Sequence, residues 1–115
     1  MTTTIYGIAN CDTIKKTLNW FKQQGLAHHF HDYRKQGIDA DWLAAVESKL
    51  GWEAMLNRRG TTWRTLDEKL RANLDQQGAL LLMQQHPALI KRPLIEHEGQ
   101  WLIGFDADTL TELML

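Results

Sequence analysis

The chain has 115 residues, with 13 lysines and arginines against 14 aspartates and glutamates, and a single cysteine, Cys11. This length suits one domain, and because a chain of this size buries about 65% of its unfolded surface, its core needs no disulfide or metal. A single cysteine excludes an internal disulfide and a cysteine-rich zinc site. The formal net charge of −1 argues against broad binding to nucleic acid or acidic membranes.

The start of the chain carries no targeting signal that we recognise. The first fourteen residues lack the lysine or arginine with which a secretory signal peptide begins. The longest apolar run, residues 79–83, is far shorter than the roughly 20 residues that cross a bilayer. We therefore expect a soluble, cytoplasmic and monomeric protein that binds neither nucleic acid nor membrane.

The N-terminal third of the chain predicts a strand, a helix and a second strand. Residues 2–9 are rich in β-branched and aromatic side chains, as a short buried strand is. Ile14 and Phe21 then lie on one face of a predicted helix, and Gly25 is placed to end it. Residues 26–33 predict the second strand. Such a βαβ unit almost always forms a right-handed crossover between parallel strands.

The rest of the chain predicts a helical segment followed by a hairpin and a helix. From residue 39 to 87 the apolar pattern is helical and is broken into short segments. Residues 94–98 and 100–105 flank Gly99 as an antiparallel hairpin, and residues 106–115 predict a terminal helix. The order βαβ, helical insertion at about 39–87, ββα predicts an α/β domain with a mixed four-stranded sheet.

The single cysteine lies between the first predicted strand and the first predicted helix, flanked by Asn10 and Asp12. Ligands of α/β sheets bind at such junctions, beside the unpaired N–H groups of the helix. Because that end of a helix stabilises an anion by about 0.3–2 kcal/mol, we expect the pKa of the Cys11 thiol to be lowered. Cys11 is therefore the candidate nucleophile, against the alternative that it is a small buried apolar residue.

Arginines provide candidate anion-binding groups. Arg58 and Arg59 lie in a segment without acidic residues, and Arg92 precedes Pro93 at the start of the predicted hairpin. Arginine presents a planar fork of N–H donors that suits carboxylates and other oxyanions. We expect these side chains to form an anion pocket with Cys11 at its floor. Spacing alone leaves open the alternative that the arginines are solvated surface residues.

Three segments together resemble the ArsC, Spx and YffB family of arsenate reductase-like proteins, and are most similar to its YffB branch. In chain order they read TIYGIANCDTIKKTLNWF, NRRGTTWRTL and HPALIKRPLI. The resemblance implies a single thioredoxin-like domain over residues 1–115 with a helical insertion. It also implies that Cys11 is the catalytic nucleophile, and that a cis peptide bond before Pro93 brings Arg92 beside the thiol as a second catalytic group.

The same resemblance implies a set of substrate-binding residues. Arg58 or Arg59 is expected to bind the anionic group of the substrate, and matching the segments does not decide between the two. Asn10 and Pro93, the neighbours of Cys11 and Arg92 in sequence, complete the expected set. We expect no metal site.

Two departures from the family narrow the expected activity. Arsenate reductases carry a further arginine in the last strand region, where this chain has Gly104, and this counts against arsenate as the substrate. Spx regulators carry a CxxC pair, whereas residues 11–14 read CDTI, which excludes an internal disulfide switch. We therefore expect a glutathione-dependent thiol reductase whose single thiolate forms a mixed disulfide.

The expected partner is glutathione as co-substrate or a glutaredoxin-like thiol donor, with no tightly bound cofactor. The alternatives are an Spx-like regulator that binds RNA polymerase and an arsenate reductase with an altered anion site.

Overall fold

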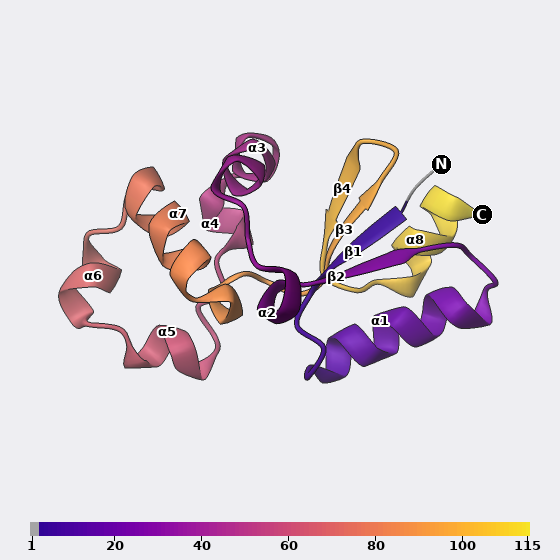
Figure 1. Ribbon diagram of the computed structural model, residues 1–115, viewed down its shortest axis with the longest axis horizontal. Coiled ribbons are helices and arrows are strands. Elements are labelled where there is room, and N and C mark those ends of the chain that lie inside the picture. The colour runs from indigo at the N-terminus through magenta and orange to yellow at the C-terminus, as the bar shows by residue number, and fades with distance from the viewer. Residues whose placement is uncertain (1–2) are drawn as a thin grey trace. The chain divides into compact units, whose positions relative to one another are not determined.

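The computed structural model describes residues 3–115, and its internal contacts divide the chain into two compact units (Figure 1). The sheet unit joins the described residues up to Asp32 to Arg92–Leu115. The helical unit is Tyr33–Lys91. The expectation of a single domain over residues 1–115 stays a prediction.

The sheet unit contains a mixed four-stranded sheet in the order β2-β1-β3-β4. Its strands are β1 (Thr3–Gly7), β2 (His29–Asp32), β3 (Leu94–His97) and β4 (Gln100–Ile103). β1 pairs in parallel with β2 and antiparallel with β3, which pairs antiparallel with β4. The predicted α/β fold with a mixed four-stranded sheet is thus confirmed. Thr2, which the prediction placed in the first strand, lies outside the described residues.

Two helices, α1 (Asp12–Gln23) and α8 (Ala107–Met114), cover one face of this sheet (Figure 1). A fully buried cluster joins the sheet to both helices, with side chains from β1, α1, β3 and α8: Ile5, Ile14, Phe21, Ile95 and Leu110. Helix α1 ends as its sequence predicts, because Gly25 adopts a φ of 66°, which favours glycine. The helix that follows Cys11 is therefore anchored on the sheet by its apolar face.

The hairpin and the start of α8 differ from the prediction at one boundary. Glu98 and Gly99 have φ values of 50° and 82° and form the tight turn between β3 and β4. The predicted last strand, residues 100–105, ends at Ile103, because Gly104 leaves the extended conformation with a φ of 88°. The Gly104 N–H still donates to the carbonyl oxygen of Pro93 at 2.8 Å, at the pair that follows Leu94 and Ile103 in the hairpin register.

The helical unit consists of short helices closed by local caps. They are α2 (Tyr33–Gln36), α3 (Ala40–Leu50), α4 (Trp52–Met55), α5 (Thr61–Thr65), α6 (Glu68–Ala72), α7 (Gln76–Gln85) and the 3₁₀ turn η1 (Pro87–Leu89). The buried carboxylate of Glu47 connects three of them, because it accepts from the Trp52 N–H at 3.2 Å and from Gln76 Nε2 at 2.5 Å.

The predicted helical segment begins earlier than residue 39. The predicted second strand, residues 26–33, extends only over His29–Asp32, and Tyr33 opens the helical turn α2. The Gly37 N–H closes this turn on the Tyr33 carbonyl oxygen at 2.9 Å, and its φ of 78° ends it. The turn is too short for apolar periodicity to reveal it in the sequence.

The N-cap of α3 in the helical unit can be tested by substitution of Asp39. Its carboxylate caps α3 by accepting from the Trp42 N–H at 2.9 Å. Asp39→Ala should lower the free energy of unfolding by about 1 kcal/mol. Asp41→Ala, at an exposed position in the first turn of the same helix, should cost only a few tenths of a kcal/mol. Equal losses in urea denaturation would contradict the assigned cap.

Candidate functional site

Cys11 is the N-cap residue of α1. Its backbone is extended, with φ −152° and ψ 127°, and its carbonyl oxygen accepts the first helical bond from the Lys15 N–H at 3.0 Å. The side chain is partly buried against the core of the sheet unit and remains partly exposed. This is the strand-to-helix junction that the sequence predicted, and it places the sulfur beside the unpaired amides of the first turn.

The surroundings of Cys11 lower the pKa of its thiol. Burial by itself raises this pKa, but the backbone N–H groups of Ile14 and Thr13 and the guanidinium of Arg92 all favour the thiolate and outweigh it. The thiol makes no side-chain capping bond of standard geometry, so these donors act chiefly on the charged form. The direction expected from the helix end is therefore found, with Arg92 as a second cause.

The pairing of β1 with β3 places Arg92 beside Cys11. The Arg92–Pro93 peptide bond is cis, and β3 starts immediately afterwards, with Leu94 paired to Tyr6 of β1. Because β1 leads directly to Cys11, the residue before the proline lies next to the thiol, to which it contributes both a hydrogen bond and a charge. Both features that the family resemblance implied at this point, the cis bond and the adjacent Arg92, are present. That Arg92 takes part in catalysis stays a prediction.

Gly7 positions the helix below this site, a role that was not predicted from the sequence. A Cβ at residue 7 would lie 2.3 Å from Cδ1 and 2.9 Å from Cγ1 of Ile14, which is fully buried, and 3.9 Å from Cγ of Arg92. Only a glycine lets β1 and α1 approach this closely. A glycine inside a predicted strand was the available signal, since it often marks a close approach of other chain segments.

Of the predicted substrate-binding residues, Pro93 is buried and the other three lie at the surface. Asn10 is exposed in the bend before Cys11. Arg58 and Arg59 are exposed in the helical unit, where the Arg58 guanidinium lies 5.7 Å from the ring centre of Trp63 and the Arg59 N–H donates to Asn57 Oδ1 at 3.1 Å. Their convergence on the thiol, and a role of Asn10 and Pro93 in substrate binding, stay predictions.

Within residues 3–115 no cluster of three histidine, cysteine or acidic side chains could hold a metal ion. None of the helices in this part of the chain is both long and apolar enough to cross a membrane.

The contribution of Arg92 can be measured on the thiol itself. Arg92→Ala removes a hydrogen bond and a positive charge from the thiolate, so the pKa of Cys11 should rise. The pH dependence of alkylation by iodoacetamide reports this pKa. Lys91→Ala removes the neighbouring exposed cation and should leave the alkylation profile unchanged. An unchanged profile in Arg92→Ala would refute the assigned interaction.

Gly7→Ala tests how the helix is positioned. The new methyl group must displace Ile14, so it should cost about 1–3 kcal/mol of stability. It should also raise the pKa of Cys11, because the Ile14 N–H moves away from the sulfur. Adding Ile14→Val removes the nearest methyl group. The double variant should therefore regain part of the lost stability, and the pKa of Cys11 should fall part of the way back. A Gly7→Ala protein whose alkylation profile matches the wild type would show that the close approach does not position the site.

Comparison with known proteins identifies the family. Residues 6–113 match the model of the ArsC family. An uncharacterized protein of Haemophilus influenzae is 47% identical over 103 residues, which cover 90% of each chain. A solved structure described as YFFB is 42% identical with a TM-score of 0.92, covering 98% of this chain and 99% of its own. The global transcriptional regulator Spx 2 of Oceanobacillus iheyensis is 27% identical over 119 residues, 99% of this chain and 84% of the regulator.

These matches confirm the resemblance that the three sequence segments indicated, together with the thioredoxin-like fold that it implied. The chain belongs to the ArsC family.

Proposed function

We propose that this protein is a glutathione-dependent thiol reductase in which Cys11 is the only nucleophile. The observation that carries the proposal is the lowered pKa of a partly exposed thiol. Burial raises this pKa, but the Ile14 amide and Arg92 lower it by more. A thiolate is the reactive form in thiol–disulfide exchange. Because the chain has one cysteine, a thiol from another molecule must complete each cycle.

The proposed cycle has two exchange steps. The Cys11 thiolate attacks the glutathione sulfur of a mixed disulfide RSSG, a bond forms between Cys11 and glutathione, and RS⁻ leaves and takes a proton from water. A glutathione thiolate then attacks this adduct, forms glutathione disulfide and releases the Cys11 thiolate. The sum is RSSG + GSH → RSH + GSSG, in which RSSG is reduced by two electrons that glutathione supplies.

The residues around Cys11 have distinct roles in this scheme. Arg92 and the Ile14 N–H stabilise the thiolate, both as the attacking group in the first step and as the leaving group in the second. One of Arg58 and Arg59 binds a carboxylate of the glutathionyl group, for which the arginine fork is suited, and Asn10 and Pro93 border that group. No resident cofactor takes part, and the cytoplasm supplies the glutathione.

A regulatory role is the second candidate, because the similarity to an Spx regulator extends over 99% of this chain. The missing second cysteine counts against a disulfide switch of the CxxC kind. A pull-down with purified RNA polymerase separates the two roles, since a regulator should retain the polymerase and Cys11→Ser should not change that. Arsenate is not proposed as the substrate, because Gly104 adopts a φ of 88° that would strain an arginine side chain there.

Intact-mass analysis after incubation with glutathione disulfide tests the proposed function. The wild type should gain one glutathionyl group on Cys11, and Cys11→Ser should gain none. Arg92→Ala should form the adduct about tenfold more slowly at neutral pH, because a charge-assisted hydrogen bond to the thiolate is lost. Lys91→Ala serves as the charge control and should react like the wild type. Absence of the adduct from the wild type would refute the proposal.

A further inference from the structure

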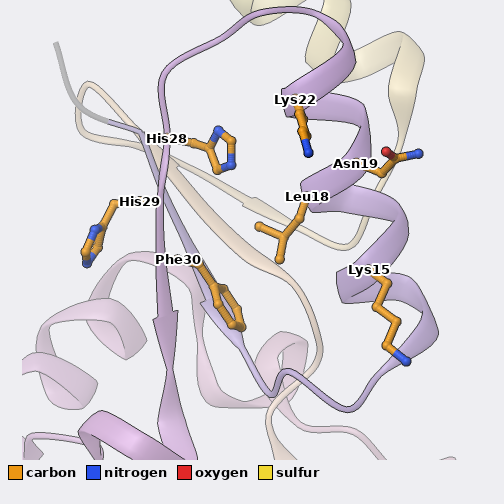
Figure 2. Close-up of a pocket in the computed structure, with 7 residues that line it drawn as sticks. All are labelled: Lys15, Leu18, Asn19, Lys22, His28, His29 and Phe30. Carbon is orange, nitrogen blue, oxygen red and sulfur yellow. The ribbon is translucent and has the colours of Figure 1, made fainter.

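A groove of about 520 Å³ runs between α1 and β2 in the sheet unit (Figure 2). Its size is within the range of ligand-binding pockets. Figure 2 shows Lys15 near the start of the helix at one end, and Lys22 facing His28 at the other end. Between them Leu18 and Phe30 point toward each other from the helix and the strand.

The groove carries positive charge that nothing lining it neutralises. Lys15 and Lys22 are seven residues apart on α1, so they lie on the same side of the helix with a rise of about 10 Å between them. Both are exposed, no carboxylate lines the groove, and neither lysine is in an ion pair with a carboxylate of residues 3–115. Asp12 and Asp32 of the sheet unit do not line the groove, and the other acidic residues of this unit are in its C-terminal part, residues 93–115.

The floor of the groove is apolar and lies at the edge of the sheet. Leu18 and Phe30 are partly buried and pack against the core of the sheet unit. Among the described strands β2 is outermost, next to β1 alone, and it lines the groove through His29 and Phe30. Cations at both ends and an apolar middle complement a segment with acidic side chains two helical turns apart and leucine-like side chains between them.

We propose that this groove docks an acidic, leucine-containing segment of the protein whose disulfide or thiol reacts at Cys11. The groove begins one helical turn beyond the nucleophile, because the Lys15 N–H donates to the Cys11 carbonyl oxygen at 3.0 Å. A bound segment therefore delivers its own protein to the start of α1. The choice of partner rests on the proposed function, whereas the docking itself requires only the groove. Free glutathione reacts without using it.

The binding test uses a fluorescent peptide without cysteine, with two glutamates two helical turns apart and leucines between them. It is titrated with the full chain and followed by fluorescence anisotropy. The wild type should bind, and the affinity should fall as salt is added. Lys22→Glu, and its combination with Lys15→Glu, should weaken binding by about tenfold. Lys16→Glu is the matched control, because this exposed lysine of the same helix does not line the groove, and it should bind like the wild type.

Peptide variants test the floor of the groove without altering the protein. Serines in place of the leucines should abolish binding, and so should lysines in place of the glutamates. Absence of binding to the wild type, equal losses in Lys22→Glu and Lys16→Glu, or unchanged binding of the serine peptide would each overturn the docking proposal.

A second measurement separates this proposal from the proposed function. Lys22→Glu should form the glutathione adduct on Cys11 at the wild-type rate, while its reaction with a mixed disulfide of glutathione and a cysteine-containing version of the peptide should be about tenfold slower than that of the wild type. A wild-type protein that forms the adduct but does not bind the peptide refutes the groove alone. A wild-type protein that binds the peptide but forms no adduct refutes the thiol reductase and, with it, the choice of partner.

Discussion

The stabilisation of a thiolate at the start of α1 is the interaction on which the site depends. Burial opposes the charge on Cys11, and two backbone N–H groups of the first turn and the guanidinium of Arg92 outweigh that cost. The donors come from separate parts of the chain, since Arg92 is distant from the helix in sequence. Strand pairing between β1 and β3 brings them together, so the chemistry of the thiol depends on the sheet being formed.

The packing beneath the site supports this arrangement. Ile14 belongs to the fully buried cluster that anchors α1 on the sheet, and its backbone N–H also faces the thiol. Gly7 allows the helix to approach β1 at this residue. On the other side, the Pro93 carbonyl oxygen is held by the Gly104 N–H at 2.8 Å. Stability and reactivity are thus coupled, because the packing that anchors α1 on the sheet also positions the thiol.

Much of the fold could be predicted from the sequence, because its signals are local. The helix after Cys11, its glycine end and the turn at Gly99 follow from apolar spacing and from residues that favour positive φ values. The boundaries at Tyr33 and Gly104 could not be predicted, because the turn at Tyr33 is too short to be periodic and the positive φ of Gly104 interrupts an apolar run that continues to Phe105.

The site itself could be predicted only in part. The position of Cys11 follows from the order of strand and helix, and the resemblance to the family supplied Arg92 and the cis bond. The role of Gly7 depends on a distance between two elements, which sequence spacing does not contain. Arg58 and Arg59 lie in the helical unit, and neither their spacing nor their local contacts decide which of them binds a substrate.

The central claim is that the N-terminal end of α1 and Arg92 stabilise the Cys11 thiolate and so lower the pKa of the thiol. A pH titration of the thiolate by its ultraviolet absorbance, with Cys11→Ser as the blank, measures this directly. The account predicts a midpoint clearly below that of an ordinary cysteine thiol. A midpoint at or above the ordinary value would contradict it.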